Sequence, residues 1–471
     1  MIWCVAGMTI TAACLRLFEL GDKSLWLDEA YTAHVIRLPL WQLLQIGDAS
    51  HMALYYIVMR GWTELAGRSE AMLRLPSALC AIATVPLIYR LGAELTDQRG
   101  GLLAALFLTL NATCIEYAQE ARTYALVMMM GTLALIFFVR TVKRGTAANA
   151  LGYVIGSAAS IYAHLFATLL VPAEWLSIWF FHAERKTLVR LSACSVVIGL
   201  LVVPVLVAAV STSPGQLATL ATPLALRIPR LIAILAGVID VGVSLPAGIV
   251  RWTFEAAAVS LTALYLLAIT LALVGAYQGR GRAPVALLTS LTFFPIVATL
   301  FMSLIQPFFV YRYMLISLPP FVILAAIGVR HLPSRAMRIA AIAAMTTLGI
   351  SNDYFYFRAP PLQDWRGAVH FVTTHAKADA LVFAYPKFND VPIGYYVGTD
   401  NIPLVPRTNM AELEQDLRPE AISNDIWLVY ASWYRLPDAV ESAMRDSERK
   451  PQETRFPGVG IILLPKPESA R

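Results

Sequence analysis

The chain has 471 residues, of which 58% are hydrophobic and 14% are charged, and its mean hydropathy is +0.63. The apolar share is well above that of an average soluble domain, which excludes a soluble globular protein for most of the chain and indicates an integral membrane protein. The net charge of +6 comes from basic residues in short loops between apolar stretches, so it reports membrane topology and not a nucleic-acid partner.

The charged residues divide the chain into two regions. Residues 1–352 hold 24 Lys and Arg and 15 Asp and Glu, whereas residues 353–471 hold 13 and 16. The second region has the charge density of a soluble domain. The sequence therefore predicts a transmembrane domain over 1–352 and a soluble domain over 353–471. The five cysteines all lie in or beside apolar stretches, so neither a disulfide framework nor a thiolate metal site is expected.

Eleven apolar stretches predict transmembrane helices. The first, residues 2–20, has no basic region ahead of it, which favours an uncleaved span over a signal peptide. The other ten lie at 72–91, 101–118, 122–140, 149–163, 164–181, 188–210, 254–276, 284–305, 312–330 and 336–352. Two of them, 149–163 and 164–181, are short for a bilayer core about 30 Å thick.

The loops between these stretches predict the orientation. Five alternate loops, near 90–100, 140–148, 182–190, 277–283 and 330–338, carry thirteen Lys or Arg residues, and the short loops between them carry two. By the positive-inside rule the basic loops are cytoplasmic. The loop over 21–71, the loop over 211–253 and the C-terminal domain are then expected outside, which for a bacterial cell means the outer side of the plasma membrane.

Two apolar segments do not fit as further spans. Residues 53–66 are short and contain Arg60 and Glu64, which favours a helix lying in the membrane interface. Residues 217–247 contain three prolines, Arg230 and Asp240. Both are expected to lie on the outer surface of the membrane, because two extra crossings would be needed to keep the basic loops on one side.

The C-terminal region alternates strand-like and helix-like patterns. Strands are predicted at 381–385, 427–431 and 460–464, and helices at 365–374 and 438–446. This alternation is typical of a small α/β domain.

The predicted outer loops hold most of the residues able to perform chemistry. The first contains the adjacent carboxylates Asp28 and Glu29 beside Trp26 and Tyr31, aromatic residues of the kind that collect at membrane interfaces. The same loop also contains His51 and Tyr55, and the later outer loops contain the following groups: Glu120, Arg122, His164, Tyr311, Arg312 and Tyr313. Since all lie at the predicted outer ends of spans, they are expected to converge on one site.

Such a set suits the transfer of a group from a lipid phosphate. A carboxylate takes the proton from an acceptor hydroxyl, while arginine and histidine stabilise the departing phosphate. Each residue also has a purely structural explanation: an acidic loop can simply be solvated, His164 can end a helix, Arg312 can reach the interface, and Glu120 can pair with Arg122.

Several motifs occur here in the order in which they occur in the GT-C glycosyltransferase superfamily. They are Leu27–Tyr31, His51–Tyr56, Arg74–Ala78, Tyr117–Leu126, Tyr162–His164 and Arg312–Tyr313. The chain thus resembles the bacterial protein O-mannosyltransferase and aminoarabinose-transferase group over residues 20–352. Its most specific element is Gln119–Tyr124. The chain departs from the pattern at Met52-Ala53, where relatives often carry prolines.

The resemblance implies a role for each candidate residue. Asp28 matches the catalytic aspartate and Glu29 the acid beside it. The donor phosphate would be bound by His51, Arg122 and Arg312. The remaining substrate-binding candidates are Tyr31, Tyr55, Glu120, His164, Tyr311 and Tyr313.

The outer residues and the resemblance together predict a glycosyltransferase that moves a hexose or pentose from a polyprenyl-phosphate donor to a lipid, glycan or protein acceptor. The resemblance implies that the reaction inverts the anomeric centre. Whether the site needs a divalent metal ion stays open. One carboxylate suffices for this chemistry, and Glu29 could either orient the acceptor or bind an ion. The alternative class is a transporter or lipid flippase, which would place polar groups near mid-membrane. The candidates for such groups are few, Glu174 and Asp240.

Overall fold

The computed structural model describes residues 1–43, 45, 51–211, 224–239, 249–279, 281–305, 309–377, 379–399, 407–416, 424–446 and 450–466. Contacts divide the chain into two compact units. The first consists of Met1–Leu20, Pro39–Gly67 and Arg74–Ala359. The second consists of Gly21–Leu38, Arg68–Leu73 and Pro360–Arg471.

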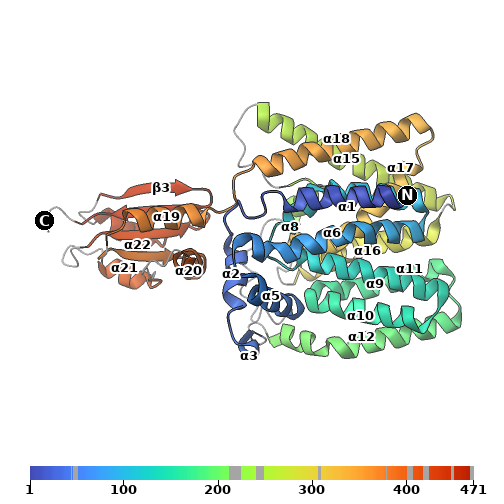
Figure 1. The fold of residues 1–471 in the computed structure, drawn as a ribbon, viewed down its shortest axis with the longest axis horizontal. Helices are drawn as coiled ribbons and strands as arrows, with labels where there is room; N and C mark the ends of the chain where they lie inside the picture. Colours follow the sequence, from blue (N-terminus) through green and yellow to red (C-terminus); the bar gives the residue numbers. More distant parts are fainter. Residues whose placement is uncertain are drawn as a thin grey trace. The chain divides into compact units, whose positions relative to one another are not determined.

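The first unit is helical (Figure 1). Its elements are α1 (Ile2–Leu17), α3 (Leu40–Leu43), α5 (Ala53–Ala66), α6 (Glu70–Leu95, whose first four residues lie in the second unit), α7 (Gln98–Thr109), α8 (Ala112–Ala118), α9 (Tyr124–Arg144), α10 (Ala147–Ala163), η1 (Leu165–Leu169), α11 (Leu170–Ile178), η2 (Trp179–Phe181), α12 (Arg185–Ser211), α14 (Leu224–Leu235), α15 (Ile249–Tyr277), α16 (Arg282–Met302), η3 (Tyr311–Ser317), α17 (Leu318–Arg330) and α18 (Arg335–Arg358).

Helical structure lies at each of the eleven positions where a span is predicted. Within the described residues, six helices are long and apolar enough to cross a membrane, and seven if the bent pair α7 and α8 is one span. The chain is therefore a multi-pass membrane protein, whereas the count of eleven spans stays a prediction. Residues 53–66 form α5, as expected. Of the predicted outer segment 217–247, the structure describes α14 and the residues after it to 239, so Asp240 lies outside the described residues.

The bend between α7 and α8 measures 62°. It occurs at Leu110 and Asn111, where the Asn111 side chain accepts a hydrogen bond from Cys114 N at 2.9 Å and so caps α8. The guanidinium of Arg16, which is fully buried, donates to the carbonyls of Leu108 at 3.0 Å and Thr109 at 3.2 Å. These carbonyls end α7, where the regular helical hydrogen bonds stop, and that of Leu108 also accepts from Asn111 N at 3.4 Å. Arg16 therefore supplies hydrogen-bond donors at the bend.

Small residues let neighbouring helices approach closely. A Cβ atom on Gly328 of α17 would lie 1.5 Å from the carbonyl oxygen of Ala268 in α15. A Cβ atom on Gly101 of α7 would lie 2.4 Å from the carbonyl oxygen of Tyr89 in α6. Another tight contact is polar: the Tyr153 hydroxyl of α10 donates to the buried carboxyl of Glu174 in α11. Glu174 thus has a hydrogen-bond partner within the bundle.

Ion pairs join the ends of several helices in the basic loops that are predicted to be cytoplasmic. Glu94 of α6 accepts from Arg140 of α9 at 2.6 Å and from Arg90 at 2.8 Å. Asp97, which caps α7, pairs with Arg330 at the end of α17. Some of the residues that predict the orientation therefore also tie helices together; the orientation itself stays a prediction.

The second unit contains a four-stranded sheet with the order β1-β2-β4-β3. The strands are β1 (Leu381–Tyr385), β2 (Ile426–Ala431), β3 (Gln452–Phe456) and β4 (Val459–Leu464); β1 runs parallel to β2, and the other two pairings are antiparallel. The helical elements are α2 (Leu27–Val35), α19 (Trp365–His375), η4 (Lys387–Asn389), α20 (Asp390–Thr399), α21 (Met410–Asp416) and α22 (Asp438–Asp446). Phe383, Leu428 and Leu464 are fully buried in the core on one face of this sheet.

The division of the chain differs from the predicted boundary at residues 352 and 353. The segment 21–38, which includes α2, and the segment 68–73 make their contacts with the C-terminal region. The sequence assigned both segments to an outer loop of the membrane domain. The difference arises from contacts between residues more than 290 positions apart, such as Arg366 with Glu70.

Candidate functional site

The turn between α8 and α9 carries Glu120 and Arg122 and is held from three sides. Ser77 of α6 donates to the carbonyl of Arg122 at 3.0 Å. Thr123 donates to the carbonyl of Ala163 at 2.7 Å. Gln119 donates to the carbonyl of Phe18 at 2.7 Å and accepts from the Tyr356 hydroxyl at 2.8 Å. The backbone of this turn is therefore fixed by helices distant in sequence, and Glu120 lies half-buried on it.

His164 lies at the junction of α10 and η1 and is 3% exposed. Its Nδ1 accepts a hydrogen bond from Phe166 N at 3.3 Å, which leaves Nε2 as the protonated nitrogen of the neutral ring. The ring lies 4.8 Å from that of Tyr313 and 6.1 Å from that of Tyr124, measured between centroids. The basic residues near enough to act electrostatically on His164 are Arg122, His51 and Arg312. Its surroundings are therefore cationic.

The segment η3 supplies three of the predicted residues, Tyr311, Arg312 and Tyr313. The Arg312 guanidinium lies 5.9 Å from the centroid of the Tyr313 ring. A further arginine, Arg230 of α14, lies 4.9 Å from the centroid of the Tyr311 ring, a cation–π geometry. Arg230 was not predicted as a site residue. The signal for it was a pair of arginines, Arg227 and Arg230, in an apolar, proline-containing segment that does not fit a span.

The start of α5 supplies the remaining predicted residues of this unit. His51 precedes the helix, and Tyr55 and Tyr56 lie in its first turn, 3% and 0% exposed. Arg122 donates to the Tyr56 hydroxyl at 3.4 Å. Tyr56 belongs to the His51–Tyr56 motif, but the sequence gave no reason to select it over Tyr55.

The first unit thus brings His51, Arg122, His164, Arg312 and Tyr313 together. We refer to His51, Arg122, Arg230 and Arg312 as the basic cluster. The first, second and fourth of these neighbour His164, and Arg230 lies over the ring of Tyr311, the residue before Arg312. Arginine forks bind phosphate with two parallel hydrogen bonds, and aromatic faces pack against sugars and lipid chains. The arrangement can bind an anionic group and stabilise charge that develops on it.

Asp28, Glu29 and Tyr31 lie in the second unit, on α2. Asp28 is partly exposed in the first turn, where the helix dipole favours a negative charge. Glu29 is 1% exposed, and its carboxylate accepts a hydrogen bond from Trp26 N at 3.3 Å. Glu29 therefore caps its own helix, a role that the sequence left open. The convergence of these residues with the basic cluster stays a prediction.

The next feature of the site is the grouping of side chains that could bind a metal ion. Within the part of the chain that the structure describes, no three His, Cys, Asp or Glu residues are grouped so that they could hold a metal ion. The question of a divalent ion therefore rests on chemistry and not on a visible ligand set.

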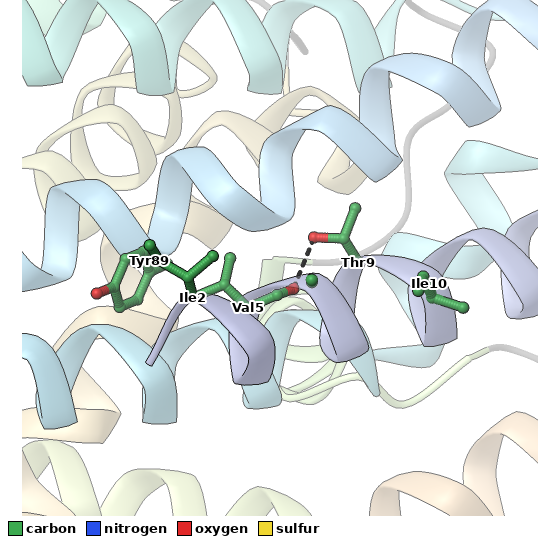
Figure 2. A pocket seen from close by; sticks show the side chains of 6 residues that line it. Ile2, Val5, Thr9, Ile10 and Tyr89 are labelled. Atoms are coloured by element: carbon green, nitrogen blue, oxygen red, sulfur yellow. Dashed lines mark hydrogen bonds between the residues drawn. The ribbon is translucent and has the colours of Figure 1, made fainter.

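A shallow apolar groove lies on the first unit, between α1 and α6 (Figure 2). Its volume is about 440 Å³, and it is lined by Ile2, Val5, Ala6, Thr9, Ile10 and Tyr89. The only polar group on α1 here, the Thr9 hydroxyl, donates to the carbonyl of Val5 at 2.9 Å. Tyr89 lies twelve residues beyond Ser77 along α6, a rise of about 18 Å. The groove is therefore remote from the turn that carries Arg122.

Solved structures of membrane glycosyltransferases have the same fold. ArnT from Cupriavidus metallidurans in the apo state matches with a TM-score of 0.59 and 10% identity, over 98% of this chain and 97% of its own. The same protein bound to undecaprenyl phosphate gives 0.58 over the same shares. The archaeal oligosaccharyltransferase AglB from Archaeoglobus fulgidus, in complex with an inhibitory peptide and a dolichol-phosphate, gives 0.57 at 12% identity, over 98% of this chain and 73% of its own.

These likenesses define the class: the chain has the fold of the GT-C superfamily of glycosyltransferases, which confirms the resemblance seen in the sequence. Within that class, residues 50–208 match the family model described as dolichyl-phosphate-mannose-protein mannosyltransferase, which covers about a third of the chain. This region contains α5, the turn with Arg122, and His164. No curated protein matches the chain by sequence.

Proposed function

We propose that this protein is a glycosyltransferase that takes a sugar from a polyprenyl-phosphate donor and passes it to a lipid, glycan or protein acceptor. The observation that carries the proposal is the basic cluster around His164 in a membrane unit with the GT-C fold. Two of the structural neighbours are bound to undecaprenyl phosphate and dolichol-phosphate, and a cluster of arginines beside tyrosines suits a ligand of that kind.

The reaction is a direct displacement at the anomeric carbon. The acceptor oxygen forms a bond to that carbon while the bond between the carbon and the phosphate oxygen breaks, and the configuration inverts. The polyprenyl phosphate leaves with the electron pair and gains one negative charge, which Arg122, Arg230 and Arg312 stabilise. The acceptor proton passes to the carboxylate of Asp28. A general base in this position contributes roughly 10²–10⁴-fold.

The proposal assigns separate roles to the two adjacent carboxylates. Asp28 is the base, because its side chain is partly exposed. Glu29 maintains the first turn of α2, because its carboxylate is buried and accepts the Trp26 amide.

A transfer assay tests the function. The purified full-length protein is reconstituted in proteoliposomes with polyprenyl phosphates that carry labelled hexoses or pentoses, and both sugar transfer and movement of the donor between leaflets are measured. Transfer to an acceptor with release of polyprenyl phosphate supports the proposal. Movement of the donor without transfer would instead identify a flippase.

We also propose a bacterial plasma membrane location with the catalytic side facing outward, as the positive-inside rule predicts. Single cysteines replace Lys143 and the exposed Asp438 in a cysteine-free background. An impermeant thiol reagent applied to intact cells should label the protein with Asp438→Cys and spare the one with Lys143→Cys. The reverse labelling would refute the orientation.

A further inference from the structure

The N-terminal end of α2, the helix that carries Asp28, is held by side chains from the C-terminal region. The first backbone N–H groups of a helix have no partner within the helix and must be satisfied from outside. The amide of Leu27, the first residue of α2, donates to Gln363 Oε1 at 2.9 Å. The amide of Leu25, two residues earlier, donates to the Tyr396 hydroxyl at 2.7 Å.

Both acceptors are themselves fixed. Gln363 is 4% exposed, and its Oε1 also accepts from the indole N–H of the fully buried Trp365 at 2.6 Å. Tyr396 is 5% exposed and donates to the carboxylate of Glu70, at the start of α6. Neither acceptor can turn away from α2 without breaking a second buried hydrogen bond.

A third residue holds the segment immediately before α2. The backbone N–H of Arg366 donates to Ser24 Oγ at 3.1 Å. Its guanidinium donates to the carbonyls of Gly21 at 2.9 Å and Asp22 at 3.1 Å, and it pairs with Glu70. Within α2, the apolar residues Ala30, Ala33 and Val35 are buried, and the helix packs against α20.

We infer that Gln363 and Tyr396 are positioning residues for the general base, so that the C-terminal domain sets the placement of the Asp28 carboxylate during transfer. Asp28 directly follows Leu27, whose amide Gln363 holds. A shift of α2 therefore moves the carboxylate by a similar distance, and a misplacement of about 1 Å can cost about 100-fold in rate. The inference rests on the proposed role of Asp28 as base.

The test compares matched variants of the full-length protein in the transfer assay. Gln363→Met keeps the size of the side chain and removes the acceptor, whereas Gln363→Glu keeps an acceptor oxygen. We expect Gln363→Met to lower kcat about 10–100-fold with the KM for the donor within about threefold, and Gln363→Glu to restore most of the rate. Tyr396→Phe should lower kcat less and in the same manner.

A control and a structural readout separate positioning from general damage. Tyr430→Phe removes a hydrogen bond of the same kind, to Glu453 at 2.7 Å, elsewhere in the unit, and should leave kcat unchanged. Hydrogen exchange of the peptide spanning residues 25–35 should be faster in Gln363→Met and Tyr396→Phe, and unchanged in Tyr430→Phe. If Gln363→Met does not accumulate, Tyr396→Phe against Tyr430→Phe gives the same comparison.

The two proposals fail in different ways. Unchanged kcat in Gln363→Met and Tyr396→Phe, in a protein that Asp28→Asn inactivates, would overturn the positioning role and leave the proposed function intact. Full activity of Asp28→Asn would overturn the role of Asp28 as base, on which the inference rests, and absence of sugar transfer by the wild type would overturn the function itself. Equal losses in kcat for Gln363→Met and Gln363→Glu would also contradict the inference, because only one of them lacks the acceptor.

Discussion

The hydroxyl of Thr123 donates a hydrogen bond of 2.7 Å to the carbonyl of Ala163, and this contact joins the two turns that carry Arg122 and His164. Each residue is adjacent in sequence to the cationic or imidazole group that it places. The bond therefore explains how a motif at the start of α9 and one at the end of α10 contribute to a common cluster, although 40 residues separate them.

The basic cluster predicts how the donor is bound. Replacement of Arg312 by Gln should raise the Kd for undecaprenyl phosphate about 10–100-fold, because a hydrogen bond to a charged group contributes about 1.5–3 kcal/mol. Arg230→Gln should have a smaller effect in the same direction, and Arg312→Lys should restore part of the affinity. Arg251→Gln, which removes an exposed cation of α15 paired with Glu255, is the control. Unchanged affinity in both Arg312→Gln and Arg230→Gln would exclude the cluster as the phosphate site.

Arg16 predicts a stability effect at the bend between α7 and α8. Arg16→Met should leave the buried carbonyl of Thr109 without its Arg16 donor, and that of Leu108 with the longer bond from Asn111 N at 3.4 Å, at a cost of about 1–3 kcal/mol. Thermal unfolding in detergent should show a marked fall in Tm. The matched control Arg251→Met breaks an exposed pair and should change stability by less than about 0.5 kcal/mol. Similar Tm values for the two variants would show that Arg16 does not support the break.

The absence of a side chain at Gly328 allows α15 and α17 to approach closely, so a larger residue there should destabilise the protein. A methyl group there would lie 1.5 Å from the carbonyl oxygen of Ala268, so Gly328→Ala must push the two helices apart. We expect a loss of at least 1–3 kcal/mol, the usual range for overpacking. Gly199→Ala in α12 meets nothing within 4 Å and should be neutral or stabilising. The yield and Tm of monodisperse protein in detergent measure both, and equal values would contradict the close approach.

Tyr396 predicts a dependence of stability on alkaline pH. Burial, and then the Glu70 carboxylate, raise the pKa of Tyr396 well above its ordinary value of 10. Its neutral form therefore stabilises the folded state fully below about pH 10, and this contribution is lost as the pH rises toward the folded-state pKa. Between pH 9 and 11 the wild type should lose about 1 kcal/mol more than Tyr396→Phe, which cannot ionise. Parallel pH profiles would mean that the hydroxyl is not buried against Glu70.

Sequence patterns predicted the elements that bury a continuous apolar surface. Helical structure lies at all the predicted spans, and β1, β2 and β4 lie where apolar runs predicted strands. Strand β3 was missed because it lies at the edge of the sheet and exposes Gln452, Glu453 and Arg455, so it lacks an apolar alternation.

The site could be predicted only in part. The motif residues were recognisable by order and type, and five of them lie near one another in the first unit; their roles stay a prediction. Arg230 was missed because no local pattern distinguishes it from a basic residue at a membrane interface. The attachment of α2 to the C-terminal region was missed because the amide of Leu27 finds its acceptor 336 residues away, and periodicity carries no information at that distance.

The most direct test of the account is the kinetics of Asp28→Asn beside Glu29→Gln, with donor binding measured on the same samples. Asp28→Asn should lower kcat by at least about 100-fold with the Kd for undecaprenyl phosphate unchanged, because the base is lost while the basic cluster is intact. Glu29→Gln keeps an oxygen that can accept the Trp26 amide, so it should retain most of the activity. Undiminished turnover in Asp28→Asn would contradict the central claim.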